Sequence, residues 1–386
     1  MDLGGMLSTG ISCFAYPRLV AALGLPPRPV RVHDTGQMLA LPDRDVMDAL
    51  DCDVVTVLGD LTNAFEQPDK WRPYDFDGRL DALVRDPAMF ETLSDGTIVQ
   101  PKHGCKMPPT SHVFESEHGG QPLVLTGDVP KPDLKQLRQD LEKARPHAEE
   151  IRAAKDLCVR VRESTDRAVF YNGPGANIGI AGYGGMAVFP LLCLLEPDFV
   201  AELHELVIGY AVEKVEALLT EVHPYVDVYT CSSDDWGTQL QTIASPDVYR
   251  DLFLPYYRLF TDAIHKAAPG VKAFLHSCGA VYDLLDYIVE SGFDILNPIQ
   301  WTAGGHTYQE WKDKSRSRLV LWGGGVNAQA TLPLGTVHDV EEEVTAIVDY
   351  MRGDGGYVFC GIHNILAEAP AENVVAMYRA AAAAKG

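Results

Sequence analysis

The stretch VKAFLHSCGAVYDLLDYIVESGFDILNPIQ, residues 271–300, decides the fold. Its apolar start, ending in HSCG, predicts a strand, and a helical pattern follows over 280–291. FDILNPIQ then predicts a second strand. Short strands that alternate with helices are typical of parallel βαβ units, so this stretch predicts an α/β protein.

The same alternation continues on both sides of this unit. Strands are predicted at 53–60, 97–104, 168–175, 225–230, 272–276, 293–298, 319–323 and 357–360. Helices are predicted at 133–157, 245–270, 280–291, 307–315, 338–352 and 370–384. Parallel strands in this number, with helices between them, predict a (β/α)8 TIM barrel. A doubly wound sheet is the alternative, but the sequence lacks the phosphate-binding G-x-G-x-x-G that such a sheet often carries after its first strand.

The barrel is predicted to form one domain over residues 1–386. Residues 1–50 are expected to be an N-terminal extension that packs on the barrel. The region around 99–133 is rich in Gly, Pro and His, which predicts an elaborated loop rather than a standard βα connection.

Composition excludes several classes of protein. A hydrophobic fraction of 46% argues against general disorder, and a net charge of −22 argues against nucleic acid or an anionic membrane surface as partner. No apolar run is long enough for a transmembrane helix, and the start does not resemble a signal peptide. Eight cysteines in 386 residues are too dilute for a disulfide scaffold, so we expect free thiols in a reducing cytoplasm.

Candidate metal ligands lie at predicted strand ends, where TIM barrels carry their reactive groups. His276 and Cys278 are two residues apart and project to the same side of an extended chain, while Cys360 ends the last strand. One imidazole and two thiolates suit Zn²⁺ and leave a fourth position open. On spacing alone, a buried cysteine and a hydrogen-bonded histidine without metal remain an alternative.

Further polar candidates follow other strand ends. Asp235, next to Asp234, is predicted to take part in proton transfer, although a helix cap is an equal alternative. His363 and Asn364 follow Cys360 closely enough to orient a metal ligand, or to serve only the loop. The predicted substrate-binding residues are Asn177, Tyr183, Gln239 and Asn297.

Three segments carry a family resemblance: HSCGAVYDLLDYIVESGFDILNPIQ (276–300), LWGGGVNAQATLPLGTVHDVEEEV (321–344) and GGYVFCGIHNILAEAPAENVVAMY (355–378). Together they resemble the uroporphyrinogen decarboxylase superfamily of TIM barrels, and more narrowly its corrinoid-linked, zinc-dependent methyltransferase branch. The resemblance is strong over 220–386 and looser before it. The H-x-C…C residues of that branch bind zinc, which implies zinc ligation by His276, Cys278 and Cys360.

The resemblance implies a zinc-dependent methyltransferase that moves a methyl group between a small molecule and a separate corrinoid protein. The cobalamin is expected on that partner, because this sequence has no D-x-H-x-x-G corrinoid-binding motif. Aromatic residues near the strand ends (Tyr183, Trp236 and Trp301) favour a methoxylated aromatic donor, hence O-demethylation. The oligomeric state, a homodimer included, stays open.

Two alternatives accompany this expectation. The decarboxylases of the superfamily use no metal and carry an arginine-rich R-Q-A-G-R-like motif near the N-terminus. This chain has VHDTGQMLA (32–40) in that region, and its acidity suits a polycarboxylate substrate poorly, so decarboxylation is the second hypothesis. A zinc-stabilised binding protein without catalytic activity is the third.

Overall fold

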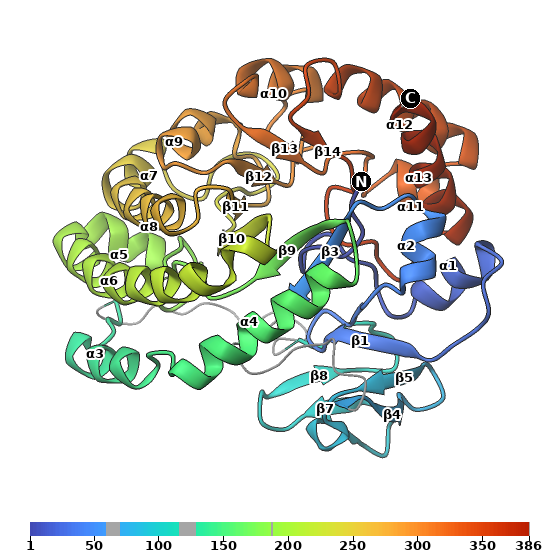
Figure 1. The fold of residues 1–386 in the computed structure, drawn as a ribbon, viewed down its shortest axis with the longest axis horizontal. Helices are drawn as coiled ribbons and strands as arrows, with labels where there is room; N and C mark the ends of the chain where they lie inside the picture. The colour runs from blue at the N-terminus through green and yellow to red at the C-terminus, as the bar shows by residue number, and fades with distance from the viewer. Residues whose placement is uncertain (59–69, 116–128, 187, 386) are drawn as a thin grey trace.

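The computed structural model describes residues 1–58, 70–115, 129–186 and 188–385 (Figure 1). Its central element is a seven-stranded parallel sheet. Across the sheet the strands are β3 (Val54–Leu58), β9 (Ala168–Asn172), β10 (Val228–Ser233), β11 (Lys272–His276), β12 (Ile295–Asn297), β13 (Val320–Trp322) and β14 (Tyr357–Val358). These strands lie side by side in sequence order, and the sheet curls with helices around its outer side. This is a TIM-barrel-like α/β fold.

The helices occupy the connections, as the βαβ pattern predicts. Those before β9 are α1 (Tyr16–Ala22), α2 (Arg44–Ala49), α3 (Leu134–Lys143) and α4 (Ala148–Glu163). Between β9 and β11 lie α5 (Phe189–Leu195), α6 (Pro197–Val222), α7 (Pro246–Leu252) and α8 (Leu254–Ala267). The rest are α9 (Leu285–Glu290), α10 (Tyr308–Ser315), α11 (Thr331–Leu334), α12 (Val337–Met351) and α13 (Ala371–Lys385). None of the helices in the described ranges combines the length and apolarity needed to cross a bilayer.

Prolines divide two helices that were predicted as continuous. The predicted helix 133–157 is α3 and α4, with Pro146 between them, and 245–270 is α7 and α8, with Pro255 in the first turn of α8. Proline has no backbone N–H and disfavours a helical conformation in the preceding residue. Ser245 caps the start of α7, because its side chain accepts from the Val248 N–H.

The strand predicted at 97–104 is not part of the parallel sheet. It forms β7 (Ile98–Gln100), which pairs antiparallel with β6 (Glu91–Thr92) and β8 (Cys105–Met107). Gly96 and Gly104 have positive φ, so the chain reverses on both sides of β7 and has no room for a crossover helix. A second small sheet contains β1 (Val30–Asp34), β2 (Leu39–Ala40), β4 (Arg72–Asp75) and β5 (Asp81–Val84).

The first residues of the chain join the two edges of the parallel sheet. The Asp53 N–H, just before β3, donates to the Met1 carbonyl oxygen at 2.7 Å. The Asp2 N–H donates to the Phe359 carbonyl oxygen, just after β14, at 2.9 Å. Residues 1–50 were predicted to pack on the barrel as an extension. Their first two residues instead lie between β3 and β14, the edge strands of the parallel sheet.

An apolar cluster fills the inside of the curled sheet. It contains Met6, Val54, Phe170, Val228, Phe274, Ile295, Trp322 and Cys360. The rings of Phe170 and Phe274 are 4.8 Å apart, and that of Trp322 is within 5.6 Å of both. His276 lies two residues beyond Phe274 and projects from the same side of β11, so polar chemistry begins directly above this layer.

Candidate metal centre

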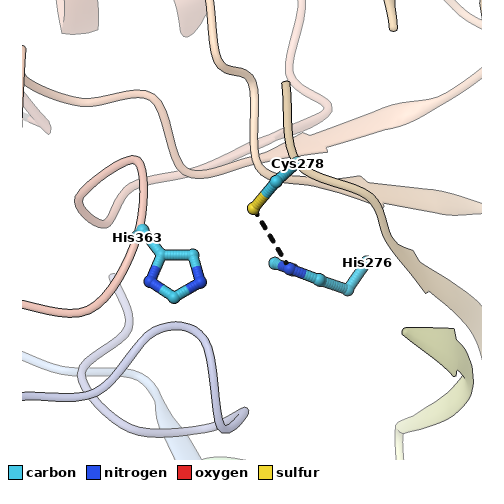
Figure 2. A group of neighbouring side chains, drawn as sticks. All are labelled: His276, Cys278 and His363. Carbon is cyan, nitrogen blue, oxygen red and sulfur yellow. Dashed lines mark hydrogen bonds between the residues drawn. The ribbon is translucent and has the colours of Figure 1, made fainter. Parts of the chain in front are cut away.

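Three side chains that could ligate a metal ion come together at the carboxyl end of the sheet. His276 ends β11 and Cys278 follows it, while His363 lies on the loop after β14. Each offers one ligand atom, and these atoms lie within 4.8 Å of one another (Figure 2). The Cys278 Sγ is 3.3 Å from His276 Nε2, and the His363 ring faces both groups. We call these three residues the His276–Cys278–His363 cluster.

Hydrogen bonds fix the orientation of the His276 ring. Asn297 donates its Nδ2 to the Trp322 carbonyl oxygen at 3.0 Å, so its Oδ1 is an acceptor. That Oδ1 lies 2.7 Å from His276 Nδ1, and the network therefore places a proton on Nδ1. The Ser8 Oγ also lies 2.8 Å from Nδ1. Nε2 is left to face Cys278, in the orientation of a metal ligand.

A carboxylate completes the surroundings of His276. Asp235 Oδ1 accepts from the Cys278 N–H at 2.8 Å and lies 3.5 Å from His276 Nε2. Burial opposes ionisation of Asp235, but interactions with His276 and the Cys278 N–H lower its pKa to about 2. Burial likewise opposes a charged His276, but Cys278 and Asp235 raise its pKa to about 10. Asp235 is therefore ionised, and a cation is favoured beside it.

The third member of the cluster is held neutral. Burial, and then the charge of His276, lower the pKa of His363 to about 4. A neutral imidazole has a lone pair for a metal ion at neutral pH. The two histidine rings lie with centroids 5.7 Å apart.

Cys360, predicted to be a zinc ligand, does not lie in this group. It is 1% exposed within the apolar cluster, and its Sγ donates to the Gly361 carbonyl oxygen at 3.3 Å. Burial raises the pKa of its thiol well above the usual range, which disfavours the thiolate that binds metals. Thus two of the three predicted ligands come together, and His363 stands where the sequence led us to expect Cys360.

Among the cavities lined by described residues, two border the cluster. One, of about 460 Å³, is lined by Cys278 and His363 together with Gln300, Thr302 and Leu332. The other, of about 520 Å³, lies against the region of β1 and β2 and is lined by His112 among others. Both are bounded by the segment 363–368, which contributes His363, Asn364, Leu366 and Glu368 to each. Small molecules can therefore reach the cluster.

The comparisons with known proteins identify the family. The family described as uroporphyrinogen decarboxylase (URO-D) matches residues 128–384 of this chain. The chain belongs to the uroporphyrinogen decarboxylase family. This confirms the resemblance to the superfamily inferred from the sequence.

Relatives within the uroporphyrinogen decarboxylase family are distant. The uroporphyrinogen decarboxylase of Pelobacter propionicus is 25% identical over 219 residues, covering 51% of this chain and 58% of that protein. The one from Geotalea daltonii is 23% identical over 265 residues, covering 66% of this chain and 69% of that protein. Among solved structures, a methyltransferase from Methanosarcina mazei has 18% identity and a TM-score of 0.49, covering 97% of this chain and 100% of that one. One fold family hosts different reactions, so the reaction has to come from the site.

The described walls of the two cavities of this uroporphyrinogen decarboxylase family member contain histidine but neither lysine nor arginine. Arg18 and Arg79 lie next to the wall of the second cavity, where they donate to the backbone oxygens of Ala367 and Ser111. The cavity beside Cys278 has no such neighbour among its described wall residues, so a polycarboxylate would find no lysine or arginine there as a counter-charge.

The other predicted site residues lie apart from the cluster, with one exception. Asn297 is fully buried and its amide is engaged by His276, Ser8 and Trp322, so it orients His276 rather than facing a substrate. Neither cavity is lined by Asn177, Tyr183 or Gln239. Asn177 has a φ of 56° on an exposed turn, Tyr183 packs near Phe189, and Gln239 accepts from Gly304 through its backbone.

Two residues near Asp235 also have structural roles. Asp234 is buried, which raises its pKa to about 7, and it accepts from the Tyr257 hydroxyl and the Ile180 N–H, each at 2.8 Å. Trp236 is 1% exposed and packs 4.6 Å from the Phe253 ring. Trp236 therefore belongs to the core, and the aromatic evidence for a methoxylated donor is correspondingly weaker.

Proposed function

We propose that this protein is a zinc-dependent methyltransferase that moves a methyl group between a small molecule and a separate corrinoid protein. The observation that carries the proposal is the His276–Cys278–His363 cluster beside a cavity of about 460 Å³. Its place, at the carboxyl ends of β11 and β14, is where TIM barrels carry their active sites.

The cluster fits zinc by its chemistry. Two imidazoles and one thiolate are nitrogen and sulfur ligands that Zn²⁺ binds readily, and three protein ligands leave a position for substrate. Because Nδ1 bonds to Asn297, Nε2 is the atom of His276 that would bind the metal, once the metal displaces the proton that a pKa of about 10 keeps on the ring. When bound, zinc supplies Lewis acidity, which makes a substrate oxygen a better leaving group or a substrate thiol a better nucleophile.

The protein's own side chains contribute orientation and charge. Asn297 and Ser8 hold the His276 ring from behind. Asp235 holds the Cys278 backbone and, with a pKa of about 2, accepts hydrogen bonds rather than donating them. A carboxylate of such low pKa is a weak base at neutral pH, so this supports Asp235 as a fixed negative charge and hydrogen-bond acceptor rather than as a base.

A methoxylated aromatic donor and the demethylating direction complete the proposal. The substrate's carbon–oxygen bond breaks, the oxygen keeps the bonding pair and gains a proton, and Co(I) donates the pair that forms the new bond. Leu334 (82% exposed) and Leu366 (59% exposed) leave apolar surface at the edge of the cavity that includes Pro333 and Leu366. Such surface is suited to contact with a corrinoid protein.

Decarboxylation is the second candidate, and the names of the relatives favour it. It requires a porphyrinogen with several carboxylates to bind beside Glu368 without a lysine or arginine on either cavity wall. Metal chelation separates the two candidates, because only methyl transfer depends on the cluster.

The test supplies zinc-loaded protein with 4-methoxyphenol and free cob(I)alamin in place of the partner. We expect methylation of cobalamin, followed by absorbance, to fall more than about 100-fold after chelation and to return on addition of one zinc per chain. Cys278→Ala should give the same loss without recovery. Methyl transfer that survives chelation, or release of CO2 from uroporphyrinogen by metal-free protein, contradicts the proposal.

A further inference from the structure

The composition, size and charge of the cavity beside Cys278 and His363 indicate which kind of molecule it binds. Most of its wall is apolar, with Leu332, Ile362 and Leu366 among the side chains. A volume of about 460 Å³ lies in the lower half of the range for small-molecule sites, roughly 300–1,000 Å³. A single aromatic ring with short substituents fits this space, whereas a ligand the size of a tetrapyrrole approaches the upper end of that range.

The charge of the wall is one-sided. Glu368 contributes a carboxylate, and no lysine or arginine lines the cavity among the described residues. The Glu368 Oε1 lies 3.2 Å from Nδ1 of His112, which lines the second cavity rather than this one. With a net charge of −22 on the whole chain, the field at this opening disfavours anions.

We propose that this cavity selects a neutral or cationic, mainly apolar molecule, and that Glu368 excludes carboxylates, phosphates and sulfonates. The inference rests on the proposed function only in assigning the ligand a methyl group. The charge preference follows from the wall itself and is independent of the reaction.

Isothermal titration calorimetry with three matched probes tests this preference. The probes are 4-methoxybenzylamine, 4-methoxybenzyl alcohol and 4-methoxybenzoate, which share the ring and the methoxy group. The metal-free protein, in which no zinc charge attracts the benzoate, should bind the amine and the alcohol at least about tenfold more tightly than the benzoate. Glu368→Gln should reduce the difference between amine and benzoate to less than about threefold, because it removes the charge and keeps the shape.

A control variant sharpens the result. Glu342→Gln makes the same charge change at an exposed position outside the cavity and should leave the order unchanged. The proposal is overturned if the benzoate binds as tightly as the amine, or if none of the probes binds. The titration contains no cobalamin and measures binding alone. If the expected order is found but the methyl-transfer test with cob(I)alamin fails, the proposed function is rejected and this inference stands.

Discussion

Replacing His363 with alanine is expected to abolish stoichiometric zinc binding, whereas Cys360→Ala is expected to retain about one zinc per chain. His363 contributes a ligand atom within 4.8 Å of those of His276 and Cys278, while the Cys360 side chain lies in the apolar cluster. Loss of a direct ligand should exceed the roughly 10–100-fold loss in affinity that follows removal of an outer-shell partner. Elemental analysis of dialysed protein and competition with a chromophoric chelator measure the change.

Cys278→Ala is the positive control and should behave as His363→Ala does. Cys360→Ala removes a buried sulfur, so its expected cost is stability, about 1 kcal/mol in the free energy of unfolding. Circular dichroism verifies that each variant is folded before its zinc is measured. Retention of zinc by His363→Ala together with its loss in Cys360→Ala would restore the ligand set expected from the sequence.

Asn297→Ala is expected to weaken zinc binding by about 10–100-fold without removing a ligand. Its Oδ1 accepts from His276 Nδ1 at 2.7 Å, and this contact determines which nitrogen of the ring is free for the metal. Without it, the ring can rotate and the proton can move to Nε2. The spectrum of the cobalt(II)-substituted protein should broaden as well, since it reports ligand geometry rather than stability.

Asn172→Ala is the matched control. Asn172 ends β9, and its Nδ2 donates to the Gly5 carbonyl oxygen and the Thr56 hydroxyl at 2.8 and 2.9 Å. Like Asn297, it bonds through its side-chain amide to a backbone oxygen and a side chain, here in a partly buried site and without a contact to His276. Its loss should lower stability by about 1–3 kcal/mol and leave zinc affinity unchanged. Equal loss of zinc affinity in both variants would show that Asn297 acts through stability alone.

Local sequence patterns predicted the parallel part of the fold. The segments 272–276 and 293–298 are short apolar runs on either side of a helical pattern, and they form β11 and β12. The same local signal failed at 97–104, because an antiparallel hairpin strand and a parallel strand look alike over a few residues. The pairing partner decides between them, and it lies outside such a window. Likewise, nothing local indicates that residues 1 and 2 join β3 to β14.

The sequence predicted the part of the candidate site that depends on residue spacing along one strand. His276 and Cys278 project together because they are two residues apart. The choice between Cys360 and His363 depends on depth within the barrel: Cys360 belongs to the layer of Phe274 and Trp322, and the loop after it returns His363 to the rim. In the sequence, a cysteine is the more obvious zinc ligand, which favoured Cys360. Only the three-dimensional structure shows that the Cys360 thiol is buried in the apolar layer. The role of Asn297 similarly depends on its pairing with His276 across β11 and β12.

X-ray absorption at the zinc edge of the zinc-loaded protein tests the central claim most directly, because it counts the sulfur ligands of the bound ion. The account predicts one sulfur at about 2.3 Å, with nitrogen or oxygen ligands at about 2.0–2.1 Å that include two imidazoles. Cys360→Ala should leave this spectrum unchanged. Two sulfur ligands per zinc, or a zinc without sulfur, would contradict the assignment of the His276–Cys278–His363 cluster as the metal site.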